Sequence, residues 1–437
     1  MTVERATTPS PTTPVVWDRF GWVILVFAFA IGIEIRLNLL GGDAFRDDLD
    51  QFVGWVHHIA TNGLGTLYGE TDAGPVTFGP VMGYIWALLA AIDPAFATAT
   101  DASNPAIRGL MKAPAAIADL GLAALVAVAL RADKRIAVLA ATGILVHPAV
   151  VNISAWWGQY ESIFALSGLA AVLAATSRRN GLAAVLIAVS LATKPQAIPL
   201  VIPLAAWFWS NGGPRELART AAIGLGTLAV LWLPFIPHGG PAGYLANLAH
   251  YQNEIFNVLS VRAWNAWWLV QEAAVGGQFI ADDVSFLGPL TLRHVGYAIT
   301  GLLSLWIALR IVRDPQPRTL IVGAAASVLV FFSFMTQMHE RYAYAALIVL
   351  ALLFGEMRVR WLWVALGVAF TLNLLAAIPP TPAIADALPV AGPLGIAGSI
   401  AMLAITAVTL VEMSRVATDP RRRAGTSGGS AAATGAA

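Results

Sequence analysis

The chain has 437 residues, of which 58% are hydrophobic and only 12% are charged, and its mean hydropathy is +0.71. This composition is too apolar for a soluble protein of ordinary size, and the absence of cysteine excludes disulfide bonds and thiolate metal sites. The formal net charge of +1 points to no particular partner and gives no sign of nucleic-acid binding.

Apolar runs long enough to cross a bilayer core, which takes about 17–25 residues, recur from end to end. We predict spans near residues 17–40, 136–152, 160–177, 181–196, 217–236, 288–309, 319–336, 342–357, 361–378 and 391–414, a shorter one near 197–210, and two further segments at 78–93 and 107–131. The predicted fold class is therefore an all-α, polytopic membrane protein of about 12–13 transmembrane helices, which form one domain over residues 17–417. The polar ends, 1–16 and 418–437, are predicted to be disordered and cytoplasmic.

Lysine and arginine collect in short loops, a pattern typical of the cytoplasmic side of a membrane protein. Six such loops alternate with the predicted spans: Arg131/Lys134/Arg135, Arg178/Arg179, Arg215/Arg219, Arg310/Arg313/Arg318, Arg358/Arg360 and Arg415/Arg421/Arg422/Arg423. If they lie inside, the first external loop, 41–77, and a long external loop, 237–287, share the other face. We therefore expect a multi-pass protein of the cell inner (plasma) membrane with its active site on the extracytoplasmic face.

Segment 78–93 poses a topological problem. Between the first external loop and Arg131 the chain has to cross the membrane an odd number of times, yet 78–93 and 107–131 are two apolar segments. Either 78–93 is re-entrant or interfacial, or Arg108 and Lys112 lie inside and one basic loop breaks the rule. We favour the first arrangement, which leaves Arg108 and Lys112 on the external face, where an anion could use them.

An acidic cluster opens the first external loop. Asp47, Asp48 and Asp50 stand together in a chain that otherwise avoids charge, and they suggest either ion binding or proton abstraction. Asp48 shares one helical face with apolar residues (Phe52, Trp55, Val56 and Ile59), so we predict a short amphipathic helix in the headgroup region. The carboxylates could instead only cap this helix and favour its dipole, but that role does not require three of them.

Polar residues also interrupt two apolar spans. In the segment 156–162, the tryptophans and the tyrosine suit an interfacial aromatic belt, whereas Gln159 and Glu161 are not belt residues and could line a cavity. Lys194 breaks another run. A lysine at membrane depth costs about 2.5–3.5 kcal/mol on insertion scales, so it usually has a partner or a function, although it could also extend to the interface.

Two further clusters belong to the same face. His339, Glu340 and Arg341 place three ionisable groups between two spans, either as an internal salt bridge or as a site that offers a cation to a phosphate oxygen and an imidazole for proton transfer. The long loop interleaves aromatic and amide side chains, as in 250–254 and 260–268, which suits a carbohydrate ring but equally suits membrane anchoring.

The motifs of nucleotide-driven enzymes are missing. The sequence has no Walker loop, no dinucleotide-binding glycine turn, no His-Glu-x-x-His zinc helix and no Gly-x-Ser-x-Gly elbow. Its histidines and acidic residues show no compact metal-ligand spacing, and it has no soluble domain of the kind a nucleotide-sugar enzyme requires. Any activated substrate should therefore be lipid-linked, with no cofactor and no divalent metal required.

These segments, in this order, resemble the GT-C superfamily of integral-membrane glycosyltransferases, above all the bacterial relatives of the GPI-anchor mannosyltransferases and, further, the dolichol-dependent glucosyltransferases. The family pattern Asp-Leu-x-x-Phe-x-x-Trp is similar to Asp48-Leu49-Asp50-Gln51-Phe52-Val53-Gly54-Trp55, and Gly-x-x-x-x-Tyr to Gly63–Tyr68. Trp-Gly-Gln-x-Asp-Ser resembles Trp157–Ser162 with Glu161 in place of Asp, and Lys-Pro-Gln resembles Lys194–Gln196. His-Glu-Arg-Tyr matches His339–Tyr342, and Ser-x-Asn-Ala-x-Asn-x-Trp resembles Ser260–Trp267.

The resemblance implies an inverting hexosyltransferase (EC 2.4.1 class) that takes a sugar, with mannose favoured, from a polyprenyl-phosphate-linked donor. The acceptor would be a hydroxyl of a lipid-linked glycan or another glycan of the cell envelope, and membrane lipids would be the other partners. Asp48 would be the general base, and the donor phosphate would meet His339, Arg341, Lys194 and Arg108. Substrate contacts would come from Asp47, Asp50, Trp55, Tyr68, Trp157, Gln159, Glu161, Gln196, Asn265 and Glu340.

Two features of the sequence limit this interpretation. The family usually has Asp-Tyr-Pro-Pro after the first loop, whereas this chain has Thr77-Phe78-Gly79-Pro80, so the acceptor side is expected to differ. The alternative from another functional class is a proton-coupled membrane transporter or lipid flippase. It predicts inverted repeats and ionisable groups spread along the spans, whereas here no repeat is found and these groups cluster at one face. The sequence says nothing of the oligomeric state.

Overall fold

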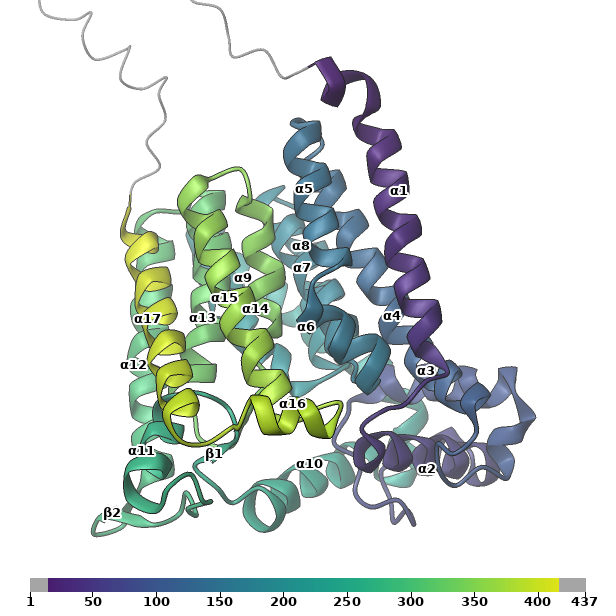
Figure 1. The fold of residues 1–437 in the computed structure, drawn as a ribbon. Helices are drawn as coiled ribbons and strands as arrows, with labels where there is room; N and C mark the ends of the chain where they lie inside the picture. Colours follow the sequence, from purple (N-terminus) through teal and green to yellow (C-terminus); the bar gives the residue numbers. More distant parts are fainter. Residues whose placement is uncertain (1–14, 416–437) are drawn as a thin grey trace, which may run out of the picture.

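The computed structural model describes residues 15–415, and most of them are helical (Figure 1). The helices are α1 (Val15–Leu40), α2 (Arg46–Asn62), η1 (Leu64–Thr66), α3 (Pro80–Ile92), η2 (Pro94–Ala97), α4 (Pro105–Ala129), α5 (Lys134–Leu145), α6 (Pro148–Val151), η3 (Asn152–Trp157), α7 (Glu161–Thr176), α8 (Asn180–Leu191), η4 (Pro195–Ala197), α9 (Ile198–Trp232), η5 (Leu233–His238), α10 (Gly240–His250), η6 (Tyr251–Ile255), α11 (Ala266–Val275), α12 (Leu292–Arg313), α13 (Pro317–Phe334), α14 (Tyr344–Leu350), η7 (Ala351–Leu353), α15 (Met357–Ala377), α16 (Pro382–Ala387) and α17 (Pro393–Ser414). The strands are β1 (Ser260–Val261), β2 (Ser285–Leu287), β3 (Leu290–Thr291) and β4 (Met338–His339).

The predicted terminal disorder at 1–14 and 418–437 concerns segments outside the described residues. Within them, residues 15 and 16, which the prediction assigned to the disordered end, belong to α1.

Seven helices of the described part are long and apolar enough to cross a membrane. A bent pair, α5 with α6 and η3, passes the same test with a 44° break, and four shorter apolar helices accompany them. Pro148 begins the second half of the bent pair, where a proline fits because its missing N–H has no partner in a first helical turn. The all-α polytopic fold is confirmed, and the predicted number of 12–13 helices is reached only when the bent pair and the shorter helices are included.

The long helix α9 is two helices joined by a sharp break. Gly212 and Gly213 have non-helical backbone angles, and Gly213 lies in the left-handed region at φ +64°. Near the break Arg178 bonds Asn211, and Asn180 bonds Glu216, whereas Leu231 at the far end accepts from Tyr84 at 2.9 Å. The second half therefore returns to the end of the bundle from which the first half started, as the separate predictions 197–210 and 217–236 require.

Helix α13 occupies the centre of the bundle and α1 its edge. Nearly every residue of α13 is buried, and its neighbours are α9, α12, α14 and α17. Helix α1 buries few side chains and exposes large apolar ones, including Val26, Phe27 and Leu37. An apolar outer surface over a helix of this length suits contact with lipid tails.

The basic loops gather at one end of the bundle. Arg318, after α12, pairs with Glu356 before α15 at 2.9 Å and with Glu412 near the end of α17 at 3.2 Å. Gly21, near the start of α1, packs against Lys134. The connections at the other end are larger and hold α2, α3, α10 and α11 (Figure 1). We call this the site end.

Helix α3 does not cross the bundle. At its start the Gly79 N–H donates to Thr193 O at 3.0 Å and the Val81 N–H to Ala192 O at 2.9 Å. After its end, η2 packs against α2, where Phe96 O bonds His57. Its 13 residues would reach about 20 Å, too short for a bilayer core. Both ends of α3 therefore lie at the site end, which agrees with the re-entrant or interfacial arrangement that we favoured.

Helix α2 is the amphipathic helix that the sequence predicts at the site end. Phe52, Trp55, Val56 and Ile59 are buried, together with Leu49 and Val53. They pack on α3 and α4 in a cluster of aromatic rings, in which Trp55 lies 5.3 Å from Trp86 between ring centroids. Asp48, at the edge of this buried face, is only partly buried. Burial of the apolar face fixes the helix and so fixes its first turn.

The bundle contains a buried ion pair that the sequence analysis did not predict. Arg36 on α1 binds Asp119 on α4, with Nη2 to Oδ2 at 2.8 Å and Nε to Oδ2 at 3.0 Å. Ser154 and Tyr344 also donate to Asp119. Arg36 and Asp119 lie within the predicted segments 17–40 and 107–131, and nothing in the local sequence indicates that they pair. We had expected the ionisable groups to cluster at one face, and this buried pair shows that they are not confined to the site end.

Close packing between α17 and the long loop gives a test of the fold. A Cβ at Gly398 would stand 2.0 Å from the ring of Trp264, which Val390 O and Asn373 hold by hydrogen bonds. Gly398→Ala is therefore expected to destabilise the protein by about 1–3 kcal/mol, measured as unfolding in detergent by near-ultraviolet circular dichroism. Gly301→Ala, at a helical glycine with open space around it, is the matched control and should cause no loss. Equal stability of both variants would contradict the packing.

Candidate active site

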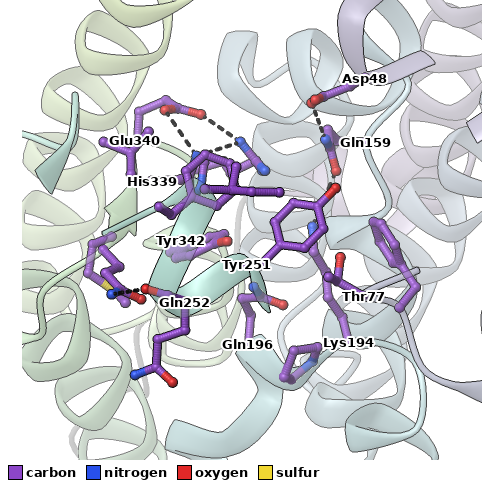
Figure 2. Close-up of a pocket in the computed structure, with 18 of the residues that line it drawn as sticks. Asp48, Thr77, Gln159, Lys194, Gln196, Tyr251, Gln252, His339, Glu340 and Tyr342 are labelled. Carbon is purple, nitrogen blue, oxygen red and sulfur yellow. Dashed lines mark hydrogen bonds and ion pairs between the residues drawn. The ribbon is translucent and has the colours of Figure 1, made fainter. Parts of the chain in front are cut away.

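A cavity of about 860 Å³ opens at the site end. Its walls come from α2, the chain before α3, the end of η3, η4, η6, and the paired strands β1 and β4. Figure 2 shows Asp48 and Gln159 on one side and His339, Glu340 and Tyr342 on the other. The predicted site residues that line it are Asp47, Asp48, Trp55, Trp157, Gln159, Lys194, Gln196, His339, Glu340 and Arg341.

Asp48 is held by two donors that converge on one of its oxygens. Oδ2 accepts from Trp157 Nε1 at 2.9 Å and from Gln159 Nε2 at 2.5 Å. Within the described part of the chain, Oδ1 has no hydrogen-bond partner. Asp48 also lies in the first turn of α2, where the helix dipole favours negative charge. The carboxylate is thus oriented by one oxygen and presents the other to the cavity.

Gly158 makes this arrangement possible. It has φ +88°, a left-handed conformation that ends the π-helical turn η3 and turns Trp157 and Gln159 toward Asp48. A Cβ at this position would meet Leu49 at 2.9 Å and Lys112 at 3.1 Å. Both the backbone angle and the close approach to α2 therefore require glycine.

Lys194 lies at the break between α8 and η4 and is buried. Its Nζ pairs with Glu161 Oε1 at 2.5 Å and donates to Gln159 Oε1 at 3.2 Å, and it also lies 5.0 Å from the centroid of the Phe78 ring. Lys194 does not extend to the interface. Gln159 joins it to Asp48, because its amide donates to the carboxylate and accepts from the ammonium group.

Arg341 lies at the opposite wall between two carboxylates. Its Nη1 pairs with Glu340 Oε1 at 3.0 Å and its Nε with Glu161 Oε1 at 3.2 Å. Its guanidinium carbon lies 5.0 Å from the centroid of the Trp157 ring. Trp157 therefore contacts both Asp48, through its N–H, and Arg341, through its face. Glu161 lies behind the cavity wall and serves as the common partner of Lys194 and Arg341.

His339 acts here as a neutral hydrogen-bonding group. Burial, with the positive charges of Arg341 and Lys194 nearby, holds the pKa of its imidazole well below the usual range. Arg341 Nη1 lies 3.2 Å from His339 Nδ1, and because a guanidinium only donates, Nδ1 is the acceptor. The proton of the neutral ring then belongs to Nε2, which can donate to an oxygen of a ligand.

Besides Glu161, four predicted site residues lie outside the residues that line the cavity. Arg108 donates to the carbonyls of Gly41, Ala102 and Ser103 and so secures the first loop instead of meeting an anion. The other three are Asp50, which binds Arg46 and the Ala102 N–H; Tyr68, which donates to Phe78 O; and Asn265, which caps α11 and donates to Phe332 O. The polar groups of these four residues form hydrogen bonds within the fold and do not line the cavity.

The outer wall contains residues that the prediction left out of the site. Tyr251 on η6 accepts from Gln51 Nε2 at 3.0 Å, and Gln252 donates to Tyr297 at 2.8 Å. Burial raises the pKa of Tyr251, and the charge of Asp48 raises it further. Gln51 lies one helical turn after Asp48, so helical spacing alone could have predicted that it lies near the site. Tyr251 lies about 200 positions away, and only the mixed aromatic and amide character of its loop pointed to it.

In the described residues no group of three histidine, cysteine, aspartate or glutamate side chains is placed to hold a metal ion. That the reaction requires no metal remains a prediction.

No protein-family model matches the chain, and no curated protein matches it. Among solved structures, the crystal structure of ArnT from Cupriavidus metallidurans, bound to undecaprenyl phosphate, is similar at 16% sequence identity. The alignment covers 90% of this chain and 78% of that chain, with a TM-score of 0.51. At this level of identity the similarity establishes the fold. The chain therefore shares the fold of this ArnT structure, and this agrees with the resemblance of its motifs to the GT-C superfamily.

Proposed function

We propose that this protein is an inverting hexosyltransferase that moves a sugar from a polyprenyl-phosphate-linked donor to an acceptor hydroxyl. The GT-C fold supports a glycosyltransferase in general, and the undecaprenyl phosphate bound by ArnT supports a lipid phosphate as carrier. Mannose is our first candidate for the sugar. The acceptor would be a lipid-linked glycan or another glycan of the cell envelope, on the extracytoplasmic face of the plasma membrane.

The observation that carries the proposal is the placement of one carboxylate and one group of cations on facing walls of a single cavity. Asp48 offers a free oxygen, while Arg341 and the N–H of His339 lie on the other side of Trp157. A sugar between them would have a base behind the acceptor hydroxyl and cations at the phosphate, the order that in-line displacement requires.

The bond changes follow from this placement. The acceptor oxygen attacks the anomeric carbon while Asp48 Oδ1 takes its proton, and the bond from that carbon to the phosphate oxygen breaks. The electron pair leaves on the lipid phosphate. One attack from the face opposite the phosphate inverts the configuration.

The leaving phosphate needs charge stabilisation more than it needs a proton, because a phosphate monoester is a stable anion. Arg341 can supply charge-assisted hydrogen bonds, and His339 Nε2 can add a neutral one. Lys194 is already paired with Glu161, so we assign to it the orientation of Gln159 and, through it, of Asp48.

A transfer assay tests this function. Purified protein in nanodiscs is supplied with polyprenyl-phosphate mannose or glucose and an envelope lipid extract, and the product is analysed by mass spectrometry and NMR. We expect one hexose to be added per acceptor, with inverted anomeric configuration and stoichiometric release of the polyprenyl phosphate. Retained configuration, or transfer only from a nucleotide sugar, would refute the proposal.

A further inference from the structure

The paired charged groups around the cavity do not by themselves favour an anion. Lys194 and Arg341 share the carboxylates of Glu161 and Glu340, and Asp48 adds a third negative charge. His339 is neutral. Asp47, which also lines the cavity, adds a fourth negative charge, so two cations face four carboxylates and the excess of negative charge would repel a phosphate group.

Arg262 is the remaining basic residue of the cavity wall. It is exposed, and its Nη1 donates to Ala377 O at 3.0 Å. Within the described residues it forms no ion pair and no hydrogen bond through Nε or Nη2. Its positive charge is therefore the one at this cavity that no carboxylate offsets, and two of its nitrogens are free to donate.

The backbone brings Arg262 next to the cation group. Strand β1 pairs in parallel with β4, with Val261 opposite His339, and Arg262 itself bridges to His339. Paired strands lie about 4.8 Å apart. Arg262 also has φ +60°, a left-handed conformation that is unusual for an arginine and that such residues adopt mainly where function or packing requires it.

We infer that Arg262 is a phosphate-binding residue that acts with Arg341 and His339 on the phosphate of the lipid-linked donor. This inference rests on the proposed function. Arg262 reduces the excess of negative charge around the cavity before the donor binds, and its free guanidinium nitrogens match the bidentate geometry of phosphate oxygens. As the sugar leaves, the phosphate gains negative charge, so the contact strengthens during the reaction.

A purely structural role is the competing explanation. The bond to Ala377 O satisfies a carbonyl at the end of α15, where helix carbonyls lack partners. That role uses one nitrogen and does not need the charge to point into the cavity. The two roles differ in what a change of charge should do to binding.

Binding of farnesyl phosphate, measured by intrinsic tryptophan fluorescence at fixed salt concentration, tests the inference. Arg262→Gln is expected to weaken binding by about 10- to 100-fold, the loss typical of a charged hydrogen bond, while Arg262→Lys keeps binding within about fivefold of the wild type. Arg262→Asn should behave as the Gln variant does, because asparagine tolerates the left-handed backbone yet lacks the charge. Arg310→Gln is the matched control, because Arg310 also bonds one helix-end carbonyl, Met413 O, and forms no ion pair in the described residues.

Three results would overturn the inference. The first is wild-type affinity of Arg262→Gln for farnesyl phosphate, and the second is an equal loss of farnesol binding, which would indicate a structural effect. The third is inorganic phosphate binding as tightly as farnesyl phosphate, which would assign the site to the free ion. Failure of the proposed function is separate, because there the wild-type protein itself would transfer no sugar from the lipid donor.

Discussion

Asp48→Asn is expected to lower kcat for sugar transfer by about 10²- to 10⁴-fold, the usual contribution of a general base. The amide oxygen of asparagine can still accept from Trp157 and Gln159, so the side chain keeps its place. Its NH₂ group then occupies the position of the free oxygen and cannot take a proton. The loss should therefore fall on kcat, with little change in the affinity for the lipid-phosphate donor.

Initial rates and donor binding of the same preparation check this prediction. Asp101→Asn is the matched control, because Asp101 is an exposed carboxylate between η2 and α4 that pairs with Arg46 and does not line the cavity. We expect this control to keep the wild-type rate. If Asp48→Asn transfers sugar at the rate of the control, Asp48 is not the base.

Arg36→Met is expected to cost about 3–5 kcal/mol of stability, the range found when one partner of a buried ion pair is removed. The substitution leaves the carboxyl group of Asp119 fully buried between α1, α4 and η3 without its guanidinium partner, with only Ser154 and Tyr344 as donors. Arg36 also donates to Leu145 O at 2.8 Å, at the break between α5 and α6, so that carbonyl loses a partner too.

Unfolding of the detergent-solubilised protein measures this loss. The double variant Arg36→Met with Asp119→Leu removes both charges and should recover most of the stability. Arg219→Met breaks the pair between the exposed Arg219 and Glu216 and should cost much less stability than Arg36→Met, because solvent screens this pair. A single Arg36 variant no less stable than the Arg219 variant would mean that the buried pair contributes nothing.

The same pair connects stability to the candidate site. Ser154, which donates to Asp119, belongs to the π-helical turn η3 that ends in Trp157 and Gly158. The position of η3 thus depends on a charge held inside the bundle, and the tryptophan that orients Asp48 depends on η3. This is a physical reason for keeping a buried ion pair where an apolar pair would also fold.

The sequence predicted the elements of this protein well wherever one local property decides the structure. Apolar runs predicted the long apolar helices, and the alternation of basic loops predicted which connections lie at the same end of the bundle. The spacing of Asp48, Phe52 and Trp55 predicted the amphipathic helix α2. It also identified Lys194 and Arg341 as charges that need partners, because burying an unpaired charge is costly.

The tertiary structure decided which of these groups meet. Trp157 and Gln159 donate to Asp48 although they lie more than 100 positions away in the sequence. Arg108, which the sequence also offered as a cation for the site, donates instead to backbone carbonyls. Local periodicity and the cost of burial carry no information about such distances. Which polar groups converge depends on how α2, η3, η4 and β4 pack, and packing depends on the shapes of buried side chains from the whole chain.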